Sequence, residues 1–355
     1  MRVVVAMSGG VDSSVAAGLL VEQGHEVIGV HMKLHDQAVS AVKAKSCCGL
    51  DDALDARVVA DKLDIPFYVM NLKAAFKKAV INDFVDSYKA GATPNPCIQC
   101  NGVLKFKVLM ARAVALGAEA LATGHYAQVE HGEDGPMLRA AVDPGKDQSY
   151  FLFPISTDAL TKTLFPLGGM TKAEVRAHAK RLGMVTADKP ESQDVCFVPD
   201  DDHARLVKEM HPDADASGEI VNEAGEVLGY HDGYYRYTVG QRKGLGIALG
   251  KPAYVLSVDP ETARVIVSTD PDRLLHQGLV AARCNWFDRP APEDVVHVRI
   301  RHRGALIPCT ISEGDVPTVQ FHEAGRAVAP GQAAVFYRGD TVLGGGFITK
   351  ALEAA

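Results

Sequence analysis

The 355-residue sequence contains no apolar run that approaches the length of a membrane-spanning helix. Its start, Met1–Ala6, leads directly into an expected strand, without the longer apolar region and small-residue cleavage site of a signal peptide. Basic residues are not in excess either, because 37 Lys and Arg stand against 44 Asp and Glu, a formal net charge of −7. We therefore expect a cytoplasmic protein without a membrane partner, which would bind RNA only through a local basic surface.

Cysteine is also scarce, and its seven copies are an odd number. Structural disulfides are uncommon in a chain of cytosolic type, so clustered cysteines indicate metal binding or catalysis. Cys97 and Cys100 form a Cys-x-x-Cys before an expected helix, and Cys196 follows almost a hundred residues later. A second pair with zinc spacing is missing from the sequence, which weakens the alternative of half a structural zinc site. The remaining four are interpreted as structural or core residues: Cys47, Cys48, Cys284 and Cys309.

The chain is too long for one compact core, which predicts two or three domains. Over the first 200 residues, strand and helix patterns alternate, and this predicts a doubly wound parallel α/β sheet that binds ligands at the carboxyl ends of its strands. The expected strands are Arg2–Ala6, Val27–Met32, Phe67–Met70 and Ala120–Thr123. The expected helices are Ser13–Gln23, Asp51–Leu63, Leu104–Leu116, and one that runs from a capping box at Thr171–Glu174 through Leu182.

A polar, acidic stretch at residues 200–215, which we expect to be a linker or an exposed helix, separates this region from a different pattern. Short β runs between Gly, Pro and Asp then predict one or two small antiparallel β domains, barrel or sandwich. The expected strands are Glu219–Val221, Tyr254–Val258, Arg264–Ser268, Val295–Ile300, Ala333–Tyr337 and Thr341–Ile348. We expect domains at residues 1–200, 201–272 and 273–355, the last a β-barrel.

The clearest motif is the string Ser-Gly-Gly-Val-Asp-Ser-Ser at residues 8–14, between the first expected strand and helix. The glycines allow a tight turn and close backbone approach, and N–H groups at a helix N-terminus favour an anion. Asp12 would hold Mg²⁺ against bound phosphates. The alternative, a capped turn without a ligand, would be preferred for an isolated Gly-Gly pair. The loop lacks the Gly-Lys-Ser/Thr ending of a Walker A motif and the spacing of a dinucleotide fingerprint.

The loop instead resembles the pyrophosphate loop (PP-loop) of ATP-pyrophosphatases, which cleave ATP between the α and β phosphates. Six strings further resemble the bacterial tRNA-specific 2-thiouridylases along nearly the whole chain. They are Ser-Gly-Gly-Val-Asp-Ser-Ser at 8–14, Thr-Pro-Asn-Pro at 93–96, Ala-Thr-Gly-His-Tyr at 122–126, Lys-Asp-Gln-Ser-Tyr-Phe-Leu at 146–152, Ser-Gln-Asp-Val-Cys-Phe-Val at 192–198 and Thr-Val-Gly-Gln-Arg-Lys-Gly-Leu-Gly at 238–246.

This resemblance implies ATP-dependent thiolation at C2 of the wobble uridine of tRNA, through an adenylated base, with release of AMP and pyrophosphate. A cysteine desulfurase or relay protein would supply the sulfur. Cys100 would be the catalytic nucleophile, Cys196 would carry the sulfur as a persulfide, and the two would end in a disulfide. The implied ATP-binding residues are Ala6, Met7, Ser8, Gly9, Gly10, Val11, Asp12, Ser13, Met32 and Gly124. The implied tRNA contacts are Asn95, Pro96 and Cys97 at the target base, Lys146, Asp147 and Gln148, and Arg301 and His302.

Cys97 departs from the best-studied branch of the family, in which the matching position is an aspartate. It resembles a second branch and related thiolation enzymes in which three cysteines hold an iron–sulfur cluster. The alternative to the persulfide is therefore a [4Fe-4S] cluster on Cys97, Cys100 and Cys196, whose open iron would deliver a sulfide.

The sequence from Arg299 to Arg303 is expected as a basic strand that places its three arginines on one face, toward phosphates. A solvated strand face is the alternative. Gln241–Gly244 is a second candidate RNA contact, and the target base must be flipped out to react. Two other function classes remain open: a PP-loop enzyme that transfers nitrogen, which would need none of the three cysteines, and an RNA-binding protein with a structural metal site.

Overall fold

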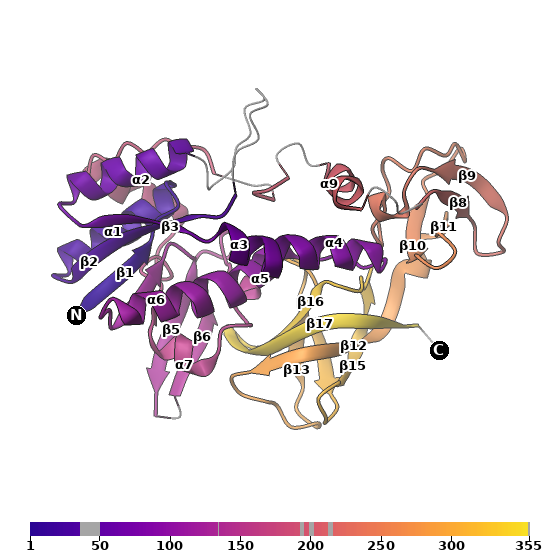
Figure 1. The fold of residues 1–355 in the computed structure, drawn as a ribbon. Helices are drawn as coiled ribbons and strands as arrows, with labels where there is room; N and C mark the ends of the chain where they lie inside the picture. Colours follow the sequence, from indigo (N-terminus) through magenta and orange to yellow (C-terminus); the bar gives the residue numbers. More distant parts are fainter. Residues whose placement is uncertain (36–49, 134, 192–194, 199–201, 212–215, 354–355) are drawn as a thin grey trace. The chain divides into compact units, whose positions relative to one another are not determined.

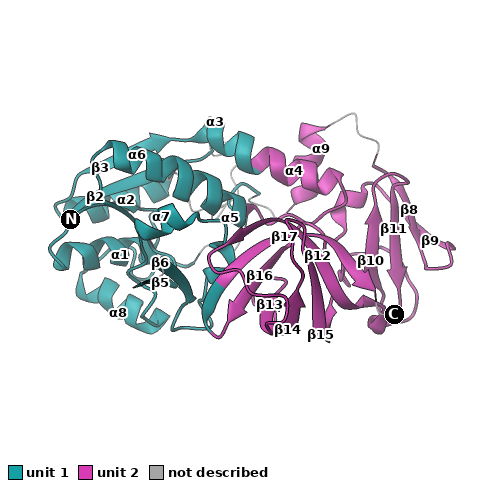
Figure 2. Cartoon of the chain, turned by 90° about the horizontal axis from the view of Figure 1, so that it is seen from below, with its two compact units in different colours: residues 1–80, 97–201, 340–342 teal, residues 81–96, 202–339, 343–355 magenta. Residues whose placement is uncertain are grey.

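The computed structural model describes residues 1–35, 50–133, 135–191, 195–198, 202–211 and 216–353. The chain divides into two compact units, which Figure 2 shows in different colours. Unit 1 comprises residues 1–80, 97–201 and 340–342, and unit 2 comprises residues 81–96, 202–339 and 343–355. Within the described ranges, no helix has both the length and the apolar character needed to cross a bilayer.

Unit 1 contains a parallel sheet with the strand order β3-β2-β1-β4-β7 (Figure 1). The four expected strands are present, and a short fifth strand was not predicted. Their bounds are β1 Arg2–Ala6, β2 Glu26–Lys33, β3 Phe67–Asn71, β4 Ala120–Thr123 and β7 Thr163–Leu164. The central strand β1 is buried along Val3–Ala6, as a parallel strand covered on both faces should be. The predicted doubly wound sheet is confirmed.

Four predicted helices are present in unit 1, and a short α7 accompanies them. Their bounds are α1 Val11–Glu22, α2 Leu50–Lys62, α6 Met110–Ala115, α7 Thr157–Thr161 and α8 Lys172–Arg181. The predicted capping box is confirmed, because the Thr171 hydroxyl accepts from the Glu174 N–H while the Glu174 carboxylate accepts from the Thr171 N–H. Helices α1 and α8 pack together through residues such as Val15 and Val175, which are fully buried.

The helix expected at Leu104–Leu116 begins earlier than predicted. Helix α5 covers Pro96–Gln99, the π-helix η2 covers Cys100–Leu109, and α6 completes the segment. Proline suits the first turn of a helix, where its missing N–H is not needed. The apolar spacing within Leu104–Leu116 therefore identified the buried part, while the Cys-x-x-Cys that opens the helix was interpreted as a loop.

Other elements of this part of the chain were not predicted. They are α3 Lys73–Phe76, the π-helix η1 Lys77–Ile81, the hairpin β5 Ala127–Gly132 and β6 Gly135–Ala140, and the 3-10 helix η3 Ser149–Phe151. The hairpin strand β6 pairs with Thr341 and Val342 at the start of β17. Arg139 of β6 pairs with Asp340, at 2.7 Å, and with Glu130.

Unit 2 contains a four-stranded sheet of order β10-β11-β8-β9. The elements in and around it are α4 Asn82–Lys89, α9 His203–Met210, β8 Gly218–Val221, β9 Val227–His231, η4 Tyr234–Arg236, β10 Tyr254–Asp259, β11 Arg264–Ser268 and η5 Pro271–Leu274. Helix α9 lies within the stretch that was expected to be a linker or an exposed helix. Tyr88 of α4 stacks on His203 of α9 at 4.5 Å between ring centroids.

The C-terminal strands of unit 2 form a closed barrel in the order β12-β15-β14-β13-β16-β17, because β17 also pairs with β12. The bounds are β12 Leu275–Trp286, β13 Val296–Arg299, β14 Ile307–Ile311, β15 Thr318–Arg326, β16 Ala333–Arg338 and β17 Thr341–Glu353. Cys309 is fully buried in its core and Cys284 packs against it. Burial raises the pKa of the Cys309 thiol to about 12 and that of the Cys284 thiol to about 11. Both thiols are therefore protonated core groups, as predicted.

The basic strand expected at Arg299–Arg303 is a wrong prediction. Strand β13 ends at Arg299, and the following residues form a turn in which Arg303 has a positive φ of 60°. A single alternating face therefore does not carry the three arginines. Arg299 lies over the ring of Tyr337 at 5.1 Å, Arg301 is exposed, and His302 is half-buried in the turn.

Candidate functional site

The loop between β1 and α1 is shaped by its two glycines. Gly9 has a φ of +79°, a left-handed conformation that glycine adopts without strain. A side chain there would also lie 2.1 Å from the carbonyl oxygen of Asp52. Gly10 is the N-cap of α1 and has no side chain to cap the helix. The first N–H groups of α1 therefore remain directed at the space in front of the loop, as an anion site requires.

Serine hydroxyls hold the loop in this form. The Ser8 N–H donates to Ser13 Oγ at 3.1 Å, and the Ser13 and Ser14 hydroxyls donate to the Gly10 carbonyl at 3.2 and 2.8 Å. Ser13 and Ser14 are buried. The serines of the string Ser8–Ser14 thus supply hydrogen bonds that stabilise the loop itself.

Gly124 and Met32 come from the ends of β4 and β2, the two strands that flank β1. A Cβ on Gly124 would lie 2.7 Å from the Ser13 nitrogen, so the backbone after β4 is packed directly on the loop. Met32 is near the end of β2, next to β1, and is 9% exposed. His31 Nδ1 lies 2.9 Å from the Met7 carbonyl oxygen, which ties β2 to the start of the loop. The residues expected to bind ATP therefore meet at the carboxyl edge of the sheet.

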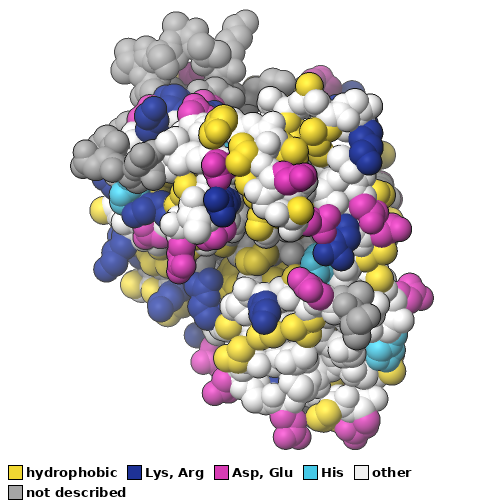
Figure 3. All heavy atoms as spheres, turned by 90° about the vertical axis from the view of Figure 1, so that its right-hand side faces the viewer, with side chains coloured by type: hydrophobic (Ala, Val, Ile, Leu, Met, Phe, Trp, Pro, Cys, Tyr) yellow, Lys and Arg dark blue, Asp and Glu magenta, His cyan; other side chains and the backbone are white. Residues whose placement is uncertain are grey.

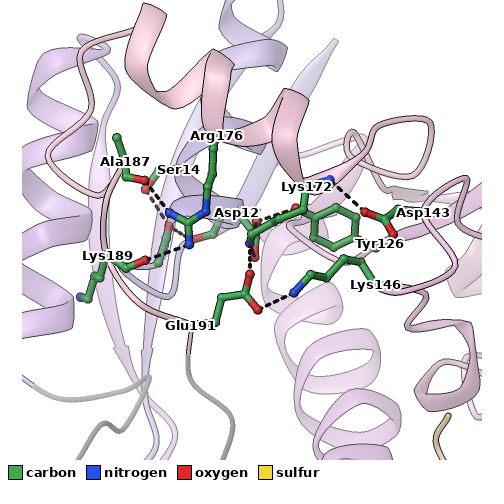
Figure 4. A network of polar contacts seen from close by, with 12 residues as sticks. Asp12, Ser14, Tyr126, Asp143, Lys146, Lys172, Arg176, Ala187, Lys189 and Glu191 are labelled. Atoms are coloured by element: carbon green, nitrogen blue, oxygen red, sulfur yellow. Dashed lines mark hydrogen bonds and ion pairs between the residues drawn. The ribbon is translucent and has the colours of Figure 1, made fainter.

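The Asp12 carboxylate is held by two side chains from other parts of unit 1. Lys172 Nζ donates to Asp12 Oδ1 and Oδ2 at 2.7 and 2.8 Å, and the Tyr126 hydroxyl donates to Oδ1 at 2.8 Å (Figure 4). Lys172 also lies over the Tyr126 ring at 5.5 Å. Burial and then the Asp12 charge raise the pKa of Tyr126, so its phenol stays protonated and donates.

Glu191 extends this network on the other side of Lys172. Its carboxylate accepts from Lys172 at 2.8 Å and from Lys146 at 2.7 Å (Figure 4). Burial alone would raise the pKa of Glu191, but hydrogen bonds and charges of Lys146 and Lys172 outweigh it and lower the pKa to about 2. Two ammonium groups and two carboxylates therefore alternate beside the loop, with their charges balanced.

A second lysine anchors the back of the loop. Lys189 Nζ donates to the Gly9 carbonyl at 3.0 Å, to Asp52 at 2.7 Å and to Asp55 at 2.5 Å. Burial would lower the pKa of Lys189, and the hydrogen bonds to Asp52 and Asp55 more than offset this and raise it. Lys189 is thus a charged brace between the loop and helix α2.

The residues expected to touch tRNA in the segment after β6 have structural contacts here. Asp147 is buried, and its carboxylate accepts from the Ser149 N–H and hydroxyl at 3.0 Å. Gln148 exchanges hydrogen bonds with the Tyr126 backbone at 2.9 Å. Lys146 is the member of this trio that holds Glu191. Asp147 and Gln148 therefore shape the turn that presents Lys146 and Tyr126.

The three candidate cysteines lie in unit 1. Cys97 is exposed in α5, and Cys100 is half-buried at the first position of η2. Cys196 is half-buried, and its neighbour Phe197 packs edge-on against Phe76 of α3 at 5.5 Å. Helix α3 in turn packs against η2. Among the described cysteines the structure records no disulfide bond. Cys47, Cys48 and residues 192–194 lie outside the described residues.

Metal binding was tested on the donor groups. In the described part of the chain, no group of three or more His, Cys, Asp or Glu side chains is arranged to hold a metal ion. This holds for Cys97, Cys100 and Cys196 as they lie in this structure. Asp12 offers the oxygen donors that Mg²⁺ prefers, as one ligand to an ion carried by phosphates, and both of its oxygens accept from Lys172 here.

The other residues expected to contact tRNA differ in their exposure to solvent. Asn95 is half-buried and Pro96 is buried at the start of α5, while Arg301 is exposed in the turn after β13. On the face drawn in Figure 3, described Lys and Arg side chains are interspersed with Asp and Glu rather than gathered into one basic field. This mixture fits the net charge of −7.

Sequence reasoning missed four members of this site: Tyr126, Lys172, Lys189 and Glu191. Tyr126 was quoted only as part of a string, and Lys172 only as part of a capping box. A signal was present for Lys172, because a basic residue in the first turn of a helix opposes the helix dipole. Lys189 and Glu191 follow a turn, in a segment outside any helix or strand and without a sequence pattern, and only the fold places them at the loop.

The parallel sheet, the glycine loop at its carboxyl edge and the closed C-terminal barrel define an α/β protein of the ATP-pyrophosphatase (PP-loop) class with appended β domains. Family models match all three regions: "tRNA methyl transferase HUP domain" at residues 1–200, "tRNA methyl transferase PRC-barrel domain" at 205–269 and "Aminomethyltransferase beta-barrel domain" at 276–348.

Relatives match the chain over its whole length. A tRNA-specific 2-thiouridylase MnmA of Geobacter metallireducens is 52% identical, covering 99% of this chain and 97% of the relative. Proteins of the same name from Geotalea uraniireducens and Rhodospirillum centenum are 53% and 48% identical, each over 99% of this chain and over 96% and 92% of theirs. The chain therefore belongs to the family of tRNA-specific 2-thiouridylases.

Among solved structures, a 4-thiouridine synthetase in complex with RNA and ATP is similar with a TM-score of 0.37 and 19% identity. The match covers 60% of this chain and 50% of that one. This likeness is too low to carry an argument about the site.

Proposed function

We propose that the protein thiolates C2 of the wobble uridine of tRNA at the expense of ATP, releasing AMP and pyrophosphate. The observation that carries the proposal is full-length membership of the thiouridylase family together with a braced PP-loop. An amide-like oxygen is a poor leaving group, and its adenylate is a good one. This is the reason for ATP chemistry at a carbonyl.

In the first step the O2 oxygen of uridine attacks the α-phosphorus of ATP, the bond to the β-phosphate oxygen breaks, and pyrophosphate leaves. The N3 proton of the base is lost. The loop backbone and the first N–H groups of α1 bind the phosphates, with the hydroxyls of Ser8 and Ser13 beside them. Mg²⁺ supplies additional charge neutralisation when it accompanies the nucleotide.

In the second step sulfur replaces the activated oxygen. The terminal sulfur of a persulfide on Cys196 attacks C2, and AMP leaves with the oxygen. The Cys100 thiolate then attacks the Sγ of Cys196, which breaks the sulfur–sulfur bond and leaves a thiolate on C2. Return of a proton to N3 gives the thiocarbonyl of the product. The two cysteines are thereby oxidised by two electrons to the Cys100–Cys196 disulfide, which an external thiol reduces. The contacts of Phe197 with α3, and of α3 with η2, support a common neighbourhood for the two cysteines.

We assign no step to an iron–sulfur cluster, because no group of three or more metal-binding side chains is found among the described residues. Asn95, Pro96 and Cys97 are proposed to contact the flipped base. The residues proposed to contact tRNA elsewhere are Lys146, Asp147, Gln148, Arg301 and His302. The sulfur donor is proposed to be a cysteine desulfurase or a relay protein. Domain limits near residues 200 and 272 are proposed as well, supported by the family-model limits.

The experiment is thiolation of purified tRNA with ATP and a persulfide donor, with AMP, pyrophosphate and nucleosides measured separately. Native protein is expected to form 2-thiouridine together with AMP. The Cys196→Ser variant is expected to form AMP with tRNA but no 2-thiouridine. A nitrogen-transferring enzyme would thiolate nothing and keep full activity without its cysteines, and a plain RNA-binding protein would release no AMP. Either result would overturn the proposal.

A further inference from the structure

Lys172 stands at the first position of α8, where a positive charge opposes the helix dipole. The rest of this helix terminus is well satisfied. The Lys172 N–H donates to Asp143 at 3.0 Å, and the Glu174 N–H donates to the Thr171 hydroxyl. These capping contacts do not involve the Lys172 ammonium. The unfavourable interaction of its charge with the helix dipole must therefore be offset by contacts of the side chain.

The side chain of Lys172 reaches across to the PP-loop. Its Nζ contacts both oxygens of Asp12, which is in the first turn of α1, and the Lys172 side chain is only 12% exposed. An ammonium group that is largely shielded from water and adjoins a phosphate-binding loop interacts strongly with any polyphosphate that enters. The loop lacks the lysine of a Walker A motif, so its own residues do not supply such a cation.

The second partner of Lys172 differs from the first. Asp12 belongs to the loop. Glu191 follows helix α8 in the sequence and also pairs with Lys146. Both carboxylates present to Lys172 the oxygens that a phosphate would also present. Glu191 is therefore a partner of Lys172 that does not belong to the loop.

We propose that Lys172 is the phosphate-binding lysine of this site: it neutralises the pyrophosphate part of ATP, and Glu191 is the internal carboxylate that the nucleotide displaces from it. The inference rests on the proposed adenylation. In that reaction negative charge grows on the departing pyrophosphate, and an ammonium beside the loop stabilises it. Lys172 would thereby act on ATP binding and on leaving-group departure, but not on the adenosine.

The first test compares nucleotides that differ in their phosphates. The Kd values of α,β-methylene-ATP, which is not cleaved at that bond, and of AMP are measured by calorimetry for native protein and Lys172→Met. We expect the analogue to bind about 10- to 100-fold more weakly to the variant, the range for loss of one charged hydrogen bond, while AMP binding changes little. Lys172→Arg should recover part of the affinity.

Lys180→Met is the matched control. Lys180 is on the same helix, and its side chain is 64% exposed. We expect native affinity for both nucleotides. A Lys172→Met variant that melts like the native protein and binds the analogue with native affinity would overturn the assignment. An equal loss for AMP and the analogue would also overturn it, since that pattern marks general damage to the site.

The second test addresses Glu191. In Glu191→Gln the ammonium no longer needs to leave a charged partner, so the analogue should bind more tightly than to native protein. The same change in a Lys172→Met background should give a much smaller gain, because no ammonium is left to release. Equal gains in both backgrounds would show simple relief of repulsion and would sink the competitor role.

These outcomes are separate from those of the proposed function. If native protein forms no AMP with tRNA, the adenylation proposal fails while the binding results still stand. If native protein thiolates tRNA and Lys172→Met binds the analogue normally, only the lysine assignment fails.

Discussion

Lys172 Nζ lies 2.7 and 2.8 Å from the two carboxylate oxygens of Asp12, a residue 160 positions earlier in the chain. The contact joins the first turn of α1 to the first turn of α8, and the two helices pack against each other along their buried faces. The PP-loop is therefore not a self-contained motif. The charge of Asp12 is balanced by Lys172, which comes from a distant part of the chain within the same unit.

The packing of Gly124 on the loop predicts a sharp difference between two glycine substitutions. In Gly124→Ala the new Cβ would lie 2.7 Å from the Ser13 nitrogen, so the loop must shift. We expect ATP affinity to fall at least about tenfold, because the N–H groups that bind phosphate move together with the backbone. Calorimetric titration with α,β-methylene-ATP measures this.

Gly169→Ala is the control for that substitution, since a Cβ there meets nothing within 4 Å and the residue is exposed. It should bind the analogue like native protein. Native affinity in a folded Gly124→Ala protein would contradict the close approach of the two backbones.

The low pKa of Glu191 predicts a pH dependence of stability. The pKa of about 2 in the folded protein lies below the ordinary value of 4.5, so the ion pairs contribute fully above about pH 4.5. That contribution is lost as the pH falls toward 2. Between about pH 4.5 and 3, the free energy of unfolding of native protein should therefore drop more steeply than that of Glu191→Gln. The difference is at most about 1.4 kcal/mol per pH unit, and less after screening, because the carboxylate is 28% exposed.

Urea unfolding at several pH values provides the measurement. Glu133→Gln is the matched control, because Glu133 is exposed in the same unit. Its curve should run parallel to the native one. If the Glu191→Gln curve is also parallel, the carboxylate is not held by Lys146 and Lys172 in solution.

The sequence was sufficient for the parts of this protein that follow from local patterns. Buried apolar runs such as Val3–Ala6 indicate strands, and Thr171 with Glu174 indicates a helix start, because both depend on neighbours in the chain. The glycine string Ser8–Ser14 indicated the loop for the same reason. The helix at Cys100 and the turn at Arg303 were missed, since a π-helix and a positive φ have no strong residue signature there.

The charge network could not be predicted from the sequence. Lys172, Lys189 and Glu191 are ordinary surface residue types. Lys172 and Lys189 are more than 100 positions from their partners in the loop and in α2, and Glu191 is linked to the loop through Lys172. Only the fold brings them to the carboxyl edge of the sheet. The family resemblance named the nucleotide-binding residues, but not the lysine and carboxylate that set the charge around them.

Arg301 provides the test of the RNA contact in unit 2. It is exposed in the turn after β13, whereas Arg299 packs over Tyr337. Arg301→Ala is expected to weaken tRNA binding and to reduce the slope of log K against log salt concentration by roughly one unit. Lys350→Ala, an exposed change on β17, is the control. An unchanged slope for Arg301→Ala, measured by filter binding over a salt series, would return this turn to a solvated surface.

Cys97→Asp distinguishes the two routes of sulfur. The exposed Cys97 is three residues before Cys100, the first residue of η2, and the three candidate cysteines form no metal-binding group among the described residues. If sulfur travels as a persulfide on Cys196, an aspartate at position 97 leaves both reacting thiols intact, as in the other branch of the family. We therefore expect Cys97→Asp to thiolate tRNA within about tenfold of the native rate when a persulfide donor is supplied without iron.

Cys196→Ser is the control and should form no 2-thiouridine. The measurement is nucleoside analysis by mass spectrometry, with iron and labile sulfide determined on anaerobically purified protein. A cluster would give the opposite pattern, because replacing a soft thiolate ligand destabilises it. Stoichiometric iron and sulfide in native protein, lost together with activity in Cys97→Asp, would overturn the persulfide route.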